Sequence, residues 1–224
     1  MRSSLLLCLA STLLIAANKN DERLTEASEV LREVMAAPDK AIPKELLNKS
    51  RCVAVIPGFK KGAFVIGVSY GKGYVSCRQP GKSSWSAPAT ILLQGGSIGA
   101  QLGGTESDLI LLVMNQRGAD SLLQSKFTLG GAIQAAAGPV GRSSTAETDA
   151  AMRAEILSYS RARGLFAGIS LQGATFRADL DSNEALYKRR LTTADIVKER
   201  KAKPTASGQK FINTLTRFSP KAIQ

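Results

Sequence analysis

The sequence predicts a mixed α+β protein in which a mostly antiparallel sheet is flanked by peripheral helices. Apolar residues recur with helical spacing near both ends of the chain, at residues 21–37 and about 204–218. Between them, residues 51–114 contain short apolar runs bounded by glycine, proline and serine, which is typical of strands joined by turns. The chain has 224 residues, of which 44% are hydrophobic, and we expect residues 18–224 to form a single domain.

The first 17 residues have the features of an export signal. Arg2 supplies a positive start, and residues 5–17 form an apolar run that is too short to cross a bilayer comfortably. A polar segment begins at Asn18. We therefore expect residues 1–17 to be a signal peptide, and the protein to be secreted or periplasmic with peripheral association to a membrane. The alternative is an uncleaved anchor or a buried N-terminal helix.

Two helices are predicted before the sheet. Residues 21–37 have apolar side chains on one face, and Asp21 is placed to cap the first turn. Pro43 suits the first position of a second, short helix that runs to about residue 48.

The predicted sheet begins with a strand that ends at a turn formed by Pro57 and Gly58. A second turn, at Gly71 and Lys72, would separate the next two strands. A continuous apolar run at residues 109–114 predicts a buried central strand. The predicted strands are residues 51–56, 62–70, 73–78, 89–93, 109–114, 156–159 and 165–177.

Helices are predicted again in the second half of the chain. Residues 127–137 are rich in alanine and glycine without a clear period, and they are not assigned. The C-terminal helix at about residues 204–218 is basic and amphipathic. The other predicted helices are residues 118–124, residues 181–188 with Asp181 or Ser182 as the cap, and a helix to about residue 199 with Thr192 or Thr193 as the cap.

Charge is distributed unevenly along the chain. The formal net charge is +12, and residues 46–105 contain seven cations but no Asp or Glu. A segment without acids cannot neutralise itself, so it presents positive potential to a partner. An anionic partner is therefore expected.

The sequence lacks the residues that most catalytic sites need. Residues 67–71 match the G-x-S-x-G pattern of serine hydrolases, but the chain has no histidine to accept the proton of Ser69. Residues 81–83 lack the upstream glycine of a phosphate-binding loop. The acidic residues near Asp179 lack the spacing of a calcium loop. We therefore predict a protein that is not an enzyme and has no cofactor or metal.

Two cysteines, Cys52 and Cys77, remain if a signal containing Cys8 is removed. An even number of cysteines in an oxidising compartment permits one disulfide. Two buried thiols are the other interpretation, and spacing alone does not decide between them.

Blocks of sequence in order along the chain resemble the SYLF domain. The resemblance covers roughly residues 24–218 and is highly specific because so many blocks match. The blocks include Cys52-Val53-Ala54-Val55-Ile56-Pro57, Tyr70-Gly71-Lys72-Gly73, Trp85-Ser86-Ala87-Pro88-Ala89, Lys126-Phe127-Thr128-Leu129-Gly130 and Gly164-Leu165-Phe166-Ala167-Gly168.

The resemblance implies a lipid-binding module with an α+β fold similar to the bacterial BON domain. Members of this family bind phospholipids, notably phosphoinositides in eukaryotes, some yeast members bind actin, and bacterial members are typically exported. An exported protein would not meet actin, so the expected partners are anionic phospholipids such as phosphatidylglycerol or cardiolipin.

The lipid-binding residues are inferred from charge, because the family's blocks consist largely of glycines and apolar residues. Each basic residue near an anionic leaflet contributes about 1 kcal/mol. Scattered solubilising charge is the alternative for any one cation, and Trp85 is more often a core residue. Nucleic acid is not expected as a partner, and an envelope module that binds a protein is the alternative function. The predicted lipid-binding residues are Lys60, Lys61, Lys72, Arg78, Lys82 and Trp85.

Overall fold

The computed structural model describes residues 2–37, 41–63, 66–79, 84–98, 103–130, 133–141, 154–162 and 165–220, with side chains from Lys19 onward. Its helices are α1 (Arg2–Ala36), α2 (Lys44–Lys49), α3 (Gln116–Leu122), α5 (Leu180–Tyr187), α6 (Thr193–Val197) and α7 (Ala206–Phe218). Its strands are β1 (Cys52–Ala63), β2 (Ile66–Cys77), β3 (Ala89–Ile98), β4 (Gly103–Val113), β5 (Lys126–Thr128), β6 (Ala135–Ala137), β7 (Ile156–Ala162), β8 (Leu165–Gly168) and β9 (Thr175–Ala178).

The described strands form one sheet in the order β5-β9-β3-β2-β1-β4-β7-β6, with β8 paired to β7. All of these pairs are antiparallel except that of β6 with β7. The predicted α+β class with a mostly antiparallel sheet is therefore confirmed. Among the described residues, no helix has the length and apolar character needed to cross a membrane.

Hydrophobic side chains fill both sides of the sheet at its base. Along β1, Val53 and Val55 enter the core beneath α1 and α7, whereas Cys52, Ala54 and Ile56 enter the core on the opposite face. Successive side chains of a strand point to opposite faces, so a strand buried on both faces has a continuous apolar sequence. This is the reason that residues 51–56 and 109–114 contain so few polar side chains.

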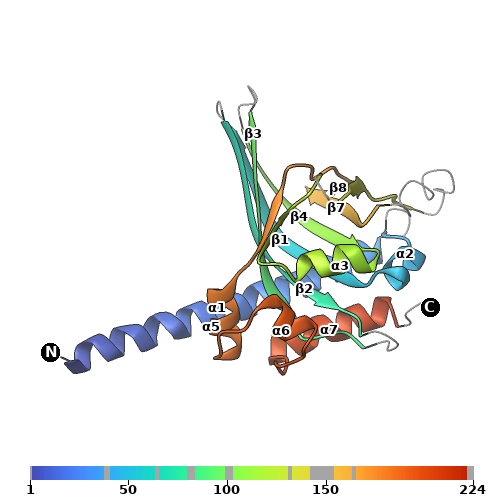
Figure 1. The fold of residues 1–224 in the computed structure, drawn as a ribbon. Coiled ribbons are helices and arrows are strands. Elements are labelled where there is room, and N and C mark those ends of the chain that lie inside the picture. The colour runs from blue at the N-terminus through green and yellow to red at the C-terminus, as the bar shows by residue number, and fades with distance from the viewer. Residues whose placement is uncertain are drawn as a thin grey trace.

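The outer halves of four strands extend beyond the helices (Figure 1). We refer to residues 60–63 of β1, 66–70 of β2, 94–98 of β3 and 103–107 of β4 as the arm. Helix α1 crosses the base of the sheet below the arm and packs against α5 and α7. The arm therefore has a face on the same side of the sheet as α1.

The predicted turn at Pro57 and Gly58 is wrong, because β1 continues through it as a β-bulge. The pairing of β1 with β4 shifts by one residue between Ile56 and Phe59. Gly58 has a φ of 58°, a conformation that glycine adopts without strain, and its N–H donates to Asp108 Oδ1 at 3.0 Å. The extra residue reverses which side chains of β1 face α1.

The predicted turn at Gly71 and Lys72 is also wrong, because β2 runs unbroken through both residues. A Cβ atom on Gly71 would lie 2.6 Å from Ile56 Cγ2, and one on Gly73 would lie 2.3 Å from the Val55 carbonyl oxygen. These glycines allow the bulged part of β1 to approach β2 closely. Glycine within a strand often allows a neighbouring backbone to approach closely. In the sequence, these glycines were indistinguishable from those of a turn.

Other predicted boundaries are shifted. The strand predicted at residues 165–177 is divided into β8 and β9, and the unassigned residues 127–137 contain part of β5 and all of β6. Helix α5 is capped by Asp179 rather than by Asp181 or Ser182, because the Asp179 carboxylate accepts from the Ser182 N–H. Helix α6 has the predicted cap at Thr192.

A disulfide joins β1 to β2. Cys52 and Cys77 are directly opposite each other in the antiparallel pair, with Cα atoms 4.0 Å apart, and their sulfur atoms are bonded. Both residues are buried in the core on the face away from α1. The bond therefore closes the base of the β1–β2 hairpin inside the protein.

Reduction of this disulfide should lower the free energy of unfolding by about 2–4 kcal/mol, because the unfolded chain gains the freedom of an opened loop. Urea denaturation with and without reductant measures the change. A Cys52→Ser/Cys77→Ser variant serves as the control and should not respond to reductant. An unchanged urea midpoint on reduction of the native protein would contradict this prediction.

Gly73→Ala should destabilise the protein by about 2–3 kcal/mol, because the added methyl group meets the backbone of β1 at 2.3 Å. Gly62→Ala is the matched control, since a Cβ at Gly62 would have no atom within 4 Å. That control should change stability by less than about 1 kcal/mol. Thermal unfolding of both variants tests the difference, and equal effects of the two substitutions would show that the close approach of β1 does not require glycine at position 73.

Candidate functional site

A pocket of about 560 Å³ opens between α1, the bulged part of β1, β2 and the start of α5. Four of its lining residues are cations and one is an acid. Helix α1 contributes Lys19, Asn20 and Arg23, β1 contributes Pro57, Gly58 and Lys60, β2 contributes Tyr70, Gly71 and Lys72, and α5 contributes Asp181, Ser182 and Ala185.

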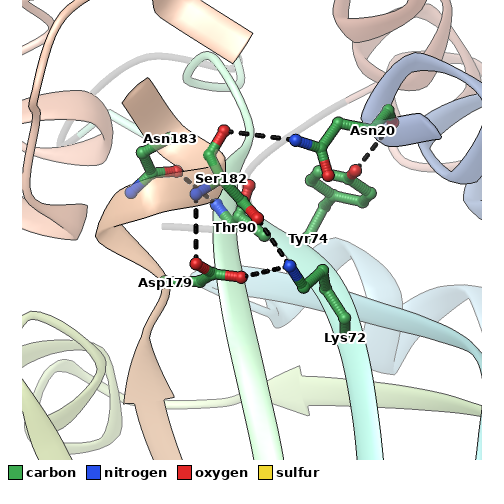
Figure 2. Close-up of polar contacts among 7 residues, drawn as sticks. All are labelled: Asn20, Lys72, Tyr74, Thr90, Asp179, Ser182 and Asn183. Carbon is green, nitrogen blue, oxygen red and sulfur yellow. Dashed lines mark hydrogen bonds and ion pairs between the residues drawn. The ribbon is translucent and has the colours of Figure 1, made fainter. Parts of the chain in front are cut away.

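Lys72 forms part of the pocket wall through a network with α5 (Figure 2). Its Nζ atom lies 2.6 Å from Asp179 Oδ2 and donates to Ser182 Oγ at 2.6 Å. Burial alone would raise the pKa of Asp179, but the hydrogen bonds from Lys72 and Ser182 outweigh it and hold the pKa below its usual value. The charge of Lys72 is therefore already compensated within the protein.

Two further contacts hold α1 and α5 in place around the pocket (Figure 2). The Tyr74 hydroxyl donates to the Asn20 carbonyl oxygen at 2.7 Å, and Asn20 Nδ2 donates to the Ser182 carbonyl oxygen at 3.4 Å. Burial raises the pKa of Tyr74, so its hydroxyl stays protonated as a donor. On the other side of α5, Asn183 Oδ1 accepts from the Thr90 N–H at 2.8 Å.

Three cations of the pocket form no close ion pair, although Glu106 of β4 lies opposite Lys60 and Arg23 acts on the nearby Glu26. Lys19, Arg23 and Lys60 form no ion pair with a carboxylate among the described residues. Asp181, the one acid in the lining, lies 3.3 Å from Arg190 Nη1 and interacts with that residue instead. The pocket therefore presents a net positive charge, which suits an anionic ligand.

Lys60 and Lys61 follow the turn predicted at Pro57 and Gly58, and because that turn is absent they do not lie together in it. Both lie in β1, where successive side chains point to opposite faces. Lys60 is opposite Tyr70 and lines the pocket, whereas Lys61 is opposite Ser69 and lies on the other face of the arm. Of this pair, only Lys60 belongs to the pocket.

Arg78 follows the end of β2 and pairs with Trp85 in an isolated β-bridge, and neither residue lines the pocket. The Arg78 guanidinium lies 4.1 Å from the centre of the Trp85 ring, and it donates to the Ser219 carbonyl oxygen at 2.8 Å. Burial lowers the pKa of Arg78 to about 10. Trp85 is only 4% exposed, so its ring does not face a headgroup layer. Lys82, the remaining predicted residue, lies outside the described residues.

Sequence reasoning missed Lys19, Arg23 and Tyr70 as site residues. Lys19 and Arg23 are four residues apart, a spacing that places both on one side of a helix. Lys19 and Arg23 precede the acid-free segment at residues 46–105, so the charge of that segment gave no reason to place them in the same site as Lys60. Tyr70 lies inside the G-x-S-x-G match and in one of the SYLF-like blocks, and neither pattern indicated a binding role.

The described part of the chain contains no group of His, Cys, Asp or Glu side chains that could hold a metal ion. The pocket instead combines ammonium and guanidinium groups with a tyrosine at its edge. Such groups bind phosphate and carboxylate oxygens through charge and hydrogen bonds.

Comparisons with known proteins agree with the resemblance seen in the sequence. A family model described as Ysc84, Las17-binding protein actin regulator, matches residues 94–218. SH3 domain-containing YSC84-like protein 1 of Bos taurus is 32% identical over 178 residues, which cover 77% of this chain and 52% of that protein. The protein of the same name in Xenopus laevis is 35% identical over 170 residues, which cover 72% of this chain and 50% of that protein.

A yeast protein is also similar to this chain. LAS seventeen-binding protein 3 of Saccharomyces cerevisiae is 30% identical over 183 residues, covering 80% of this chain and 39% of that protein. The chain spans about half the length of the curated animal relatives it matches. With more than half of its residues matched by the family model, the chain belongs to the Ysc84 family, which is the SYLF-domain family.

Proposed function

We propose that the protein binds anionic phospholipid surfaces without catalysing a reaction, and that the pocket cations contact the headgroup phosphates. The observation that supports this proposal is the convergence of Lys19, Arg23 and Lys60 on one pocket without ion-paired carboxylates. The proposal sets the protein in the cell envelope or outside the cell, as the export signal expected at residues 1–17 implies.

The expected binding is reversible and depends on salt. Each cation near an anionic leaflet contributes about 1 kcal/mol to binding, so Lys19, Arg23 and Lys60 together contribute about 3 kcal/mol. The Debye length is about 10 Å at 0.1 M salt and about 3 Å at 1 M, so high salt screens most of this attraction. Membrane association should therefore be peripheral.

A protein partner is the second candidate function. One relative is named for binding LAS seventeen, and the matching family model is described as a Las17-binding actin regulator. A complex with a protein would survive both detergent and high salt, whereas binding to lipid headgroups would not. Pull-down under these conditions distinguishes the two functions.

Lys60→Glu should weaken binding to vesicles of phosphatidylcholine and phosphatidylglycerol. Reversal of one charge changes the interaction by about 2 kcal/mol, which corresponds to about 30-fold in affinity. Lys61→Glu is the matched control, because it makes the same charge change one residue away on the opposite face of β1. We expect that control to change affinity by less than about threefold.

Vesicle co-sedimentation over a range of salt concentrations measures both effects. Vesicles of phosphatidylcholine alone should bind neither variant nor the native protein. Equal losses for Lys60→Glu and Lys61→Glu would show that net charge, and not the pocket, governs binding. The proposed function would be refuted if the native protein bound neutral vesicles, or if it bound neither kind of vesicle.

Lys72→Met should lower the free energy of unfolding by about 1–3 kcal/mol, because it leaves the buried Asp179 carboxylate without its partner. A Lys72→Met/Asp179→Asn variant removes both charges and should recover part of the loss. Urea denaturation measures the three proteins. If Lys72→Met leaves stability unchanged but weakens vesicle binding as strongly as Lys60→Glu, Lys72 is a headgroup ligand instead of a structural residue.

This stabilisation should depend on pH with a definite sign. The pKa of Asp179 is lower in the folded protein than in the unfolded chain, where an aspartate has a pKa of about 3.9. The ion pair therefore contributes fully above about pH 4 and is lost as the pH falls through the lower folded value. The stability difference between the native protein and Lys72→Met should shrink below about pH 4. A difference that stays constant on acidification would argue against the ion pair as its source.

A further inference from the structure

Large hydrophobic side chains are exposed on the arm. Val68 is 64% exposed and Tyr70 is 47% exposed, and they are two residues apart on β2. Residues at this spacing share a face of the strand. Their face is that of Lys60, which is directly opposite Tyr70, and Tyr70 itself lines the pocket.

The side chain of Val68 has only glycines beside it across the neighbouring strands. Gly96 of β3 and Gly62 of β1 are paired with Val68, and Gly104 of β4 is paired with Gly62. An added Cβ would meet no atom within 4 Å at Gly62, and none closer than 3.9 Å at Gly96 or Gly104. Val68 therefore projects from a flat surface of backbone, where no neighbouring side chain shields it.

The combination of this apolar surface with the pocket cations favours a membrane as the occupant. Tyrosine is enriched at the level of lipid headgroups, where its hydroxyl stays hydrated and its ring contacts acyl chains. Lys60 next to Tyr70 complements anionic headgroups at the same level. Two exposed side chains offer far less area than the roughly 800 Å² per partner of a stable protein interface.

We infer that Val68 and Tyr70 insert into the interfacial layer of an anionic bilayer while Lys60 and the other pocket cations contact its phosphates. This inference rests on the proposed function and adds an apolar anchor to it. The arm then lies against the bilayer with its glycine-rich face, and the helices at the base of the sheet stay in water.

A Val68→Trp variant tests the insertion directly. The native chain contains one tryptophan, Trp85, which is buried and so provides a constant background. The variant is mixed with phosphatidylglycerol vesicles whose acyl chains are brominated. The fluorescence emission of the added tryptophan should then shift to shorter wavelength and be quenched by the bromine atoms. Leu165→Trp is the matched control: Leu165 is 67% exposed but lies on β8, which β1, β4 and β7 separate from β2 in the sheet. That control should be quenched little.

A second variant measures the contribution of the anchor to affinity. Val68→Ser should weaken binding to the same vesicles about fivefold, since it removes the apolar contact but leaves every charge in place. Both variants alter an exposed position, and their thermal unfolding should match that of the native protein. Lys61→Ala, on the opposite face of the arm, should bind as the native protein does.

The possible outcomes separate the two proposals. Vesicle binding at native strength without quenching of Val68→Trp would overturn the inserted anchor and leave headgroup binding intact. Equal quenching of Val68→Trp and Leu165→Trp would also overturn it. A blue shift of Val68→Trp without vesicles that grows with protein concentration would identify a second copy of the chain as the occupant. Failure of the native protein to bind the vesicles would refute both proposals.

Discussion

The β-bulge at Pro57–Phe59 is the constraint on which the site depends. One extra residue in β1 reverses the alternation of its side chains, so that Phe59 enters the core and Lys60 faces the pocket. The bulge fits only because Gly71 and Gly73 leave room beneath it. Asp108 holds it by accepting from the Gly58 N–H, and Arg161 in turn binds Asp108 at 2.7 Å.

Local sequence signals were sufficient for elements whose chemistry is local. The cap at Thr192 and the apolar run at residues 109–114 each depend on near neighbours, and each was predicted near its observed position. The helix predicted at residues 21–37 ends where α1 ends, but α1 begins at Arg2, so the predicted cap at Asp21 is wrong and Asp21 lies within the helix. Glycines 71 and 73 were misread because turn glycines and close-packing glycines look the same in one sequence. The residues of β1 that contact them are 12 or more positions away, so no local pattern distinguishes the two roles.

The acid-free segment indicated an anionic partner but did not identify the site. Charge neutralisation in a folded protein is three-dimensional, and two of its cations find partners far along the chain: Lys72 pairs with Asp179, and Arg78 donates to Ser219. Lys60 and Lys61 are divided between two faces by the strand geometry. Cations outside the segment, Lys19 and Arg23, complete the pocket. Net charge of a sequence window therefore predicts potential more reliably than it predicts contact residues.

The contact between Asn20 and Ser182 has a consequence for the time at which the pocket comes into existence. These residues are 162 positions apart, and they bring together the α1 and α5 walls of the pocket. During synthesis, the first wall is made long before the second, and contacts at such separation form late because the intervening chain must be closed into a loop. A chain that is still emerging from the ribosome, or that passes unfolded through a pore, contains the pocket cations, but they are not yet close together. The positive pocket is therefore a property of the finished molecule and is absent from its nascent forms.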